Sequence, residues 1–89
     1  MMEGNLIQRV QPNYPSPAHI ARIQGKVELS AVIGKAGTIE NLRVLAGHPM
    51  LLSAAIEAVK QWRYRPYILN GEPVEVETRI TVNFSLSGS

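Results

Sequence analysis

The C-terminal part of the sequence carries an unbroken two-residue alternation, and this pattern constrains the fold more than any other. Over residues 74–86, polar residues alternate with residues suited to one buried face, namely Val74, Val76, Thr78, Ile80, Val82, Phe84 and Leu86. A period of two predicts a β-strand with one face in the core. At about 3.3 Å per residue this strand would span roughly 40 Å, well beyond the usual length. We therefore expect a long strand that extends past its neighbours.

Two more strands are predicted earlier in the chain. Residues 26–33 alternate in the same way, and residues 38–46 follow after a Gly-Lys-Ala-Gly turn, so the two segments should form a hairpin. In the second of these strands the apolar phase slips after Ile39. One extra residue has this effect, so we expect a β-bulge near Glu40 and Asn41.

Two helices are also predicted. Ser16 can cap a short first helix with Pro17 in its first turn, and Gly25 can end it. The second helix should start at His48-Pro49 and end before Pro66. Its apolar positions recur at spacings of three and four, namely Leu52, Ala55, Ile56, Val59 and Trp62. Asn70-Gly71, followed by Pro73, marks a tight turn into the last strand.

This order of elements predicts an α+β fold in which two helices pack on one face of a three-stranded antiparallel sheet. The second helix connects the strand at 38–46 to the last strand. It places the last strand beside the strand at 26–33 and antiparallel to it, because a right-handed crossover is strongly favoured. The last strand is then an edge of the sheet. The domain should cover residues 9–86, with tails at residues 1–8 and 87–89.

Composition excludes several classes of function. The chain has 89 residues, 45% of them hydrophobic, which suits one small domain without a long apolar run. A net charge of +2 does not indicate nucleic-acid binding, and without cysteine there are no disulfides or thiolate sites. His19 and His48 have no metal-ligand spacing, and no phosphate loop or nucleophile elbow occurs. We expect neither catalysis nor a cofactor, metal or small-molecule substrate.

The predicted edge strand is the candidate interface. Proteins usually blunt such edges with Lys, Pro or bulges, and residues 74–86 contain none of these. The edge could pair with a second copy of the chain, or the segment before Tyr14 could cover it. Alternatively, an extended peptide could add a strand to it, with backbone hydrogen bonds supplying the affinity.

A set of motifs, taken in order, resembles the C-terminal domain of TonB-type energy transducers. It comprises Gln-Pro-Asn-Tyr-Pro at 11–15, Gly-Lys-Val at 25–27, Gly-Thr-Ile at 37–39, the Ala-rich helix ending Trp-Arg-Tyr-Arg-Pro at 62–66, Asn-Gly-Glu-Pro-Val at 70–74, and Phe84. The resemblance covers about residues 9–86. It implies a periplasmic domain, tethered in a full-length protein by an inner-membrane helix and a proline-rich spacer that are absent from this sequence.

The resemblance also implies partners and contact residues. Such domains grip the TonB box of outer-membrane receptors and are driven by an ExbB- and ExbD-like inner-membrane complex. The box pairs with the last strand, here Thr78, Arg79, Ile80, Thr81, Val82, Asn83, Phe84 and Ser85. A second contact, near the receptor plug, maps onto Gln11, Pro12, Asn13, Tyr14 and Pro15. Ser53 departs from the family, in which many members carry Asp. A homodimerisation or scaffold domain using the same edge, not linked to transport, is the alternative.

Overall fold

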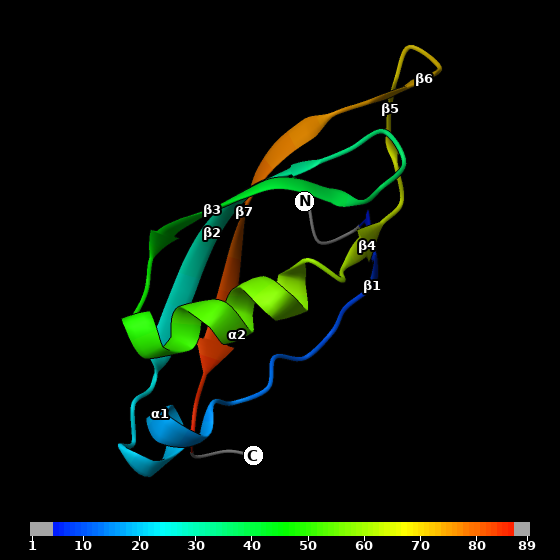
Figure 1. Cartoon of the computed structure of the whole chain (residues 1–89). Helices are drawn as coiled ribbons and strands as arrows, with labels where there is room; N and C mark the ends of the chain where they lie inside the picture. Colours follow the sequence, from blue (N-terminus) through cyan, green and yellow to red (C-terminus); the bar gives the residue numbers. More distant parts are fainter. Residues whose placement is uncertain (1–4, 87–89) are drawn as a thin grey trace.

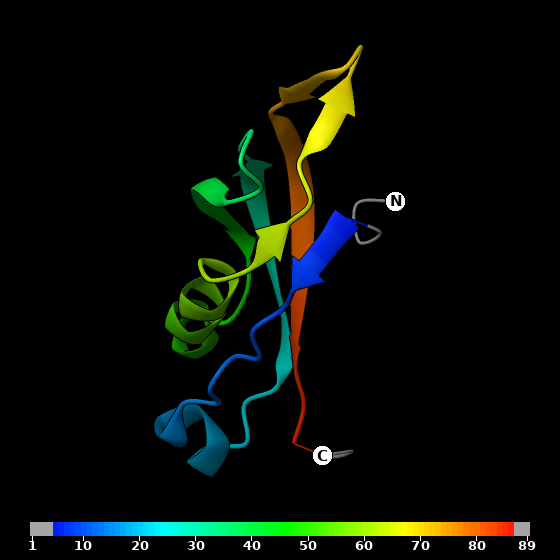
Figure 2. The same ribbon diagram turned by 90° about the vertical axis from the view of Figure 1, so that its right-hand side faces the viewer.

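The computed structural model describes residues 5–86 as an elongated domain of 49 × 22 × 18 Å (Figure 1). Its centre is a three-stranded antiparallel sheet with the order β3-β2-β7. Both helices lie on the same side of this sheet (Figure 2). The predicted α+β fold is confirmed. In chain order the elements are β1 (Leu6–Gln8), α1 (Ser16–Ile20), β2 (Gly25–Ile33), β3 (Ile39–Ala46), α2 (Pro49–Val59), β4 (Arg63–Tyr64), β5 (Tyr67–Leu69), β6 (Glu72–Val74) and β7 (Val76–Phe84).

The last strand lies at the predicted edge but is shorter than predicted. β7 begins at Val76, and the chain leaves strand geometry at Glu75. Val74 belongs to β6 and pairs with Tyr67 of β5. Asn70 and Gly71 have φ values of 52° and 81°, the geometry of a two-residue hairpin turn, so the chain first pairs with its own preceding segment. The prediction of one continuous strand over residues 74–86 was wrong.

The β2–β3 hairpin and its bulge are confirmed. Val32 pairs with Glu40 and Ser30 with Arg43, so two residues of β3 face one residue of β2 between these pairs. Asn41 lies within this bulge and takes a positive φ of 49°. A second irregularity, between Glu28 and Leu29 of β2, was not predicted. The bulges leave β3 with two local distortions along its length.

The first helix differs from the prediction at both ends. Pro15 is the N-cap and no side chain caps the helix, so the predicted capping role of Ser16 was wrong; Ser16 is the first helical residue. The helix ends at Ile20, and the positive φ falls on Arg22 (57°) rather than on a capping glycine. Gly25, predicted to end the helix, is the first residue of β2. With five residues, α1 depends on packing, and Ala18 is its one buried side chain.

The second helix starts as predicted but ends earlier. α2 runs from Pro49 to Val59, so Pro66 does not end it. Trp62, predicted on the helix, follows it with its side chain in the core. The buried positions of α2 are Leu51, Ala55, Ala58 and Val59, whereas the predicted core residues Leu52 and Ile56 are half-buried. Compared with the predicted apolar face, the buried face of α2 is therefore rotated towards Leu51 and Ala58.

The N-terminus of α2 has a side-chain cap. His48 Nδ1 accepts a hydrogen bond from the Met50 N–H at 3.1 Å. We expect His48→Ala to lower the free energy of unfolding by about 1 kcal/mol, because this N–H then loses its acceptor. His48→Asn, which keeps an acceptor at the cap, should retain most of the stability. Urea unfolding followed by circular dichroism measures both, and equal losses in the two variants would contradict the capping role.

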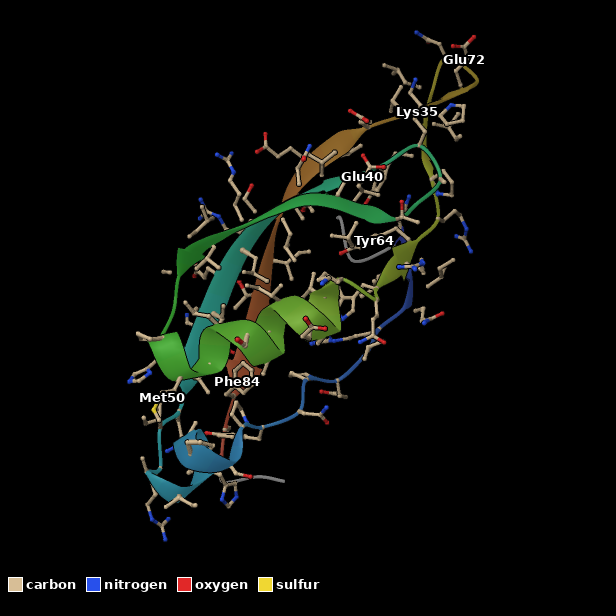
Figure 3. All side chains as sticks on the ribbon, in the orientation of Figure 1. Lys35, Glu40, Met50, Tyr64, Glu72 and Phe84 are labelled. Atoms are coloured by element: carbon tan, nitrogen blue, oxygen red, sulfur yellow. The ribbon has the colours of Figure 1, made fainter. Side chains whose placement is uncertain are left out.

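The core lies between the helices and the inner face of the sheet. Its fully buried members are Ala18, Val27, Leu29, Ala31, Ile33, Leu51, Ala55 and Val59, joined by Trp62, Tyr64, Ile80, Val82 and Phe84. Phe84 lies at the α1 end of the sheet, whereas Tyr64 lies towards the other end, where Glu72 marks the tip of the β5–β6 hairpin (Figure 3). Trp62 and Tyr64 are buried in the core, whereas Arg63 and Arg65, which alternate with them in the sequence, are exposed.

Candidate functional site

The free edge of the sheet is formed by β7. Nine successive residue pairs join β7 to β2, from Gly25 with Phe84 to Ile33 with Val76, without any register shift. Within residues 5–86, β7 has no strand partner on its other side. Because a strand carries backbone N–H and C=O groups on both sides, one row of these groups on β7 is left for another strand.

Side chains and backbone groups alternate along this edge. Thr78, Ile80, Val82 and Phe84 are buried towards the helices, whereas Arg79, Thr81 and Asn83 are exposed on the open face. Just past β7, the Leu86 N–H donates to Gln24 Oε1 at 3.0 Å, on the β2 side. Since the N–H direction alternates along a strand, the N–H groups of Thr81 and Asn83 point to the unpaired side. The predicted contact residues 78–84 thus all lie in β7, and Ser85 follows its end.

The opposite edge of the sheet is less suited to pairing. β3 carries two register irregularities, and most of its side chains are exposed. Bulges twist a strand and interrupt the row of hydrogen-bonding groups, which is how many proteins protect an edge. Of the two edges, only β7 offers an uninterrupted row.

The predicted second contact, residues 11–15, is held in place at both ends. Trp62 Nε1 donates to the Val10 carbonyl at 3.0 Å. At the other end, the Tyr14 hydroxyl donates to the Ile23 carbonyl, and the Tyr14 ring meets the Phe84 ring edge-on with centroids 5.5 Å apart. The structure therefore brings Tyr14 to the end of β7. It does not bring Gln11, Pro12, Asn13 or Pro15 there, because these residues lie against α2.

The region beside β7 also contains residues that the sequence did not indicate. Residues 6–8, placed in the N-terminal tail from sequence, form β1, which pairs with β4. The Arg9 guanidinium lies 5.2 Å from the centroid of the Trp62 ring. Together with residues of β7, these elements form a hollow of about 120 Å³, lined by Leu6, Arg9, Trp62, Tyr64, Arg79, Ile80 and Thr81. In the sequence, the alternating aromatic and cationic residues at 62–65 were the one signal that pointed to this region. β1 could not be predicted, because a strand of three residues is too short to show a periodicity.

The charges at this site are exposed. Glu77 accepts a hydrogen bond from the Ser30 hydroxyl at 3.2 Å across the open face, and Arg79 lies two residues further along β7. At the start of the β5–β6 hairpin, desolvation by burial raises the pKa of the Tyr67 hydroxyl. Within residues 5–86, no three His, Cys, Asp or Glu side chains gather in a way that could hold a metal ion. The same residues contain no helix that is long and apolar enough to span a membrane.

Fold and edge together define the class of this domain: a small α+β domain with one regular, open sheet edge beside an N-terminal segment fixed on the helix layer. Comparison with known families then identifies it. The model of the family described as Gram-negative bacterial TonB protein C-terminal matches residues 10–86. The chain belongs to this family.

Individual relatives agree with this assignment. The chain is 35% identical over 82 residues to Protein TonB of Vibrio cholerae. The matched region covers 90% of this chain and 34% of that protein. It is 36% identical over 84 residues to Protein TonB of Klebsiella pneumoniae, covering 92% and 32% respectively. The chain thus spans about a third of the length of these relatives. The solution NMR structure of the Pseudomonas aeruginosa TonB CTD has the same fold, with a TM-score of 0.77, 24% sequence identity, and coverage of 94% of this chain and 87% of that one.

Proposed function

We propose that this domain acts in TonB-type energy transduction, by pairing the free edge of β7 with the TonB box of outer-membrane receptors. The uninterrupted, unpaired edge of β7 carries this proposal, and membership of the TonB C-terminal family supports it. The role is one of binding and force transmission rather than catalysis. An extended peptide would lie along residues 78–85, with Arg79, Thr81 and Asn83 beside it on the open face.

The energetics of such pairing suit a reversible contact. Each backbone hydrogen bond contributes a net of about 0.5 to 1.5 kcal/mol. Five or six of them sum to about 2.5 to 9 kcal/mol, so after the cost of ordering the peptide and the edge we expect a dissociation constant between about micromolar and millimolar. A contact of this strength forms readily and releases its partner again.

The structure offers a path for force from a peptide bound at this edge. β7 is held to β2 by nine residue pairs, so a pull along β7 is shared over the whole ladder. Tyr14 adds a second connection, because it joins the end of β7 to the N-terminal segment through Phe84 and the Ile23 carbonyl. We propose that this segment continues, in the full-length protein, to an inner-membrane anchor and an ExbB/ExbD-like complex, which places the domain in the periplasm.

A proline at an outward-facing position of β7 tests the proposed pairing. We expect Asn83→Pro to weaken binding of a synthetic TonB-box peptide by at least about tenfold, because it removes one backbone donor and adds a ring at the edge. Thr81→Pro should act in the same way. The measurement is a peptide titration followed by backbone amide chemical shifts, in which residues 79–85 of the unchanged chain should shift.

The matched control is Thr81→Val, which keeps the N–H and changes only the exposed side chain. Its affinity for the peptide should stay close to that of the unchanged chain. The pairing proposal is wrong if the amides of residues 79–85 do not move at millimolar peptide, or if the proline variants bind as well as Thr81→Val.

The second candidate function is homodimerisation or a scaffold role through the same edge, unconnected with transport. It rests on the same observation, since an unpaired strand can pair with a second copy as well as with a peptide. Light scattering over a range of concentrations separates the two. A dimer that Asn83→Pro dissociates would favour this candidate, whereas a monomer that binds the peptide would favour the transport role.

A further inference from the structure

A second hollow lies away from β7, between the N-terminal segment and α2. It is a groove of about 300 Å³. One wall is formed by the extended chain of residues 10–15, and the other by one stripe of the helix and the residues that follow it. The lining side chains used below are Pro12 and Asn13 on the first wall and Ala54, Glu57, Ala58 and Gln61 on the second.

The walls of the groove are fixed by contacts outside it. The hydrogen bond from Trp62 Nε1 holds Val10 at one end of the segment, and the Tyr14 contacts with Ile23 and Phe84 hold the other end. Pro12 fixes one backbone dihedral between these points, and Pro15 fixes another directly after Tyr14. The groove is therefore largely formed before any ligand arrives, and little ordering is needed to fill it.

The helix wall of the groove has an apolar surface because α2 presents small side chains there. Ala54 and Ala58 are one turn apart on α2, and Ala58 is only 3% exposed. Pro12 adds an apolar surface from the opposite wall. A flexible aliphatic chain of three or four carbons would find contact on both sides.

The rim of the groove carries a single charge. Glu57 is the only charged residue in the lining. Its carboxylate lies 3.6 Å from Lys60 Nζ, but the two side chains are 72% and 57% exposed, so this pair is weak and readily exchanged. Gln61 Nε2 donates to the main-chain carbonyl of Glu57 at 3.0 Å, and the Gln61 side-chain carbonyl supplies a second acceptor among the lining residues.

We propose that this groove binds a lysine or arginine side chain of a partner protein. The aliphatic stem of such a side chain lies along Ala54 and Ala58, as long basic side chains commonly lie on apolar surfaces. Its cationic head reaches the Glu57 carboxylate and displaces Lys60. The charge of the groove and its apolar surface both select this chemistry, because an aliphatic side chain would gain nothing from the carboxylate and an acidic one would be repelled by it. The inference does not depend on peptide pairing at β7.

Three small probes test the chemistry directly. N-acetyl-arginine amide, N-acetyl-norleucine amide and N-acetyl-glutamate amide are titrated into the labelled chain while the backbone amides of residues 53–61 are followed. The arginine probe should shift these amides and bind about fivefold to tenfold more tightly than the norleucine probe, because a hydrogen bond between two charged groups is added. The glutamate probe should produce no saturable shift.

Two variants in the groove and one control outside it assign the effect. Glu57→Gln should reduce arginine binding to the level of norleucine, whereas Glu72→Gln, which removes one acid at the tip of the β5–β6 hairpin, should not. Ala54→Leu fills the groove and should abolish binding of both probes. Thermal unfolding of each variant shows whether it is folded.

The results that would overturn the inference are distinct from those that bear on β7. Norleucine binding equal to arginine binding, with no effect of Glu57→Gln, would show an apolar groove without cation preference. The absence of saturable shifts at residues 53–61 with any probe would show that the groove binds no such side chain. Shifts at residues 79–85 on addition of a TonB-box peptide report on β7 separately and leave this outcome unchanged.

Discussion

Gly37→Ala should lower the free energy of unfolding by about 3 to 5 kcal/mol, because the variant combines backbone strain with a steric overlap. Gly37 has a φ of +85°, which residues with a side chain rarely adopt. A Cβ at this position would overlap the main-chain carbonyl oxygen of Tyr64. The two residues are also joined by a hydrogen bond from the Tyr64 N–H to the Gly37 carbonyl at 2.8 Å, so neither backbone can move away without losing it.

The chain contains a matched control for this prediction. Gly71 has nearly the same φ, +81°, but a Cβ there would meet no atom within 4 Å. Gly71→Ala should therefore cost only the conformational strain, about 1 to 2 kcal/mol. Urea unfolding followed by circular dichroism gives both values. Equal losses would mean that the contact between the β2–β3 turn and β4 does not constrain residue 37.

The effect should extend from the turn to the N-terminal segment. Beyond the Tyr64 contact, Thr38 forms a bridge with Arg63, and β4 in turn pairs with β1. These short pairings have few residues and depend on one another. We expect Gly37→Ala to increase amide hydrogen exchange at residues 6–8 and 63–65 before it affects β2 and β7.

The central sheet could be predicted from the sequence because its strands alternate strongly and its topology follows a general rule. The edge position of β7 depended only on the order of the elements and on the right-handed crossover. The break at Glu75 could not be predicted in this way. Alternation reports which side chains face the core, and it continues through Val74 and Val76 although the backbone changes its pairing partner between them.

The ends of the helices were predicted less well, because distant contacts determine them. Pro66 acts only on its own neighbourhood, whereas α2 ends at Val59 and the chain then places Trp62 in the core, hydrogen-bonded to Val10. Just after α1, Arg22 takes the positive φ that local preference assigns to a glycine. Tertiary packing overrides the local signal at both positions.

The β7 edge and the groove beside α2 also differ in how far they could be predicted from the sequence. The contact residues on β7 follow one another in the sequence, so a pattern could place them on one strand. The groove beside α2 requires the segment of residues 10–15, whose first residue is 52 positions from Trp62, to lie against the helix. No periodicity connects Val10 with Trp62, and the position of Glu57 at the rim becomes informative only when both walls are known.

Trp62→Ala should lower the free energy of unfolding by about 3 to 5 kcal/mol, the range observed when a large buried aromatic side chain is removed. The Trp62 side chain is only 5% exposed and packs in the core, and its indole N–H is bonded to Val10. The substitution also removes the surface on which the Arg9 guanidinium lies. Because a domain of this size has a total stability of about 5 to 15 kcal/mol, this variant should be close to unfolding at 37 °C.

Trp62→Phe separates the hydrogen bond from the packing. Phenylalanine keeps most of the apolar surface but leaves the Val10 carbonyl without its donor, so the loss should be about 1 to 3 kcal/mol. The variant should remain folded, yet the N-terminal wall of the groove beside α2 loses one of its two fixed ends. We expect faster amide exchange at Gln11 and Asn13 and weaker binding of N-acetyl-arginine amide, with unchanged exchange in β7. If Trp62→Phe matched the unchanged chain in both stability and exchange, the Val10 bond would not hold this segment, and the groove would need another source of rigidity.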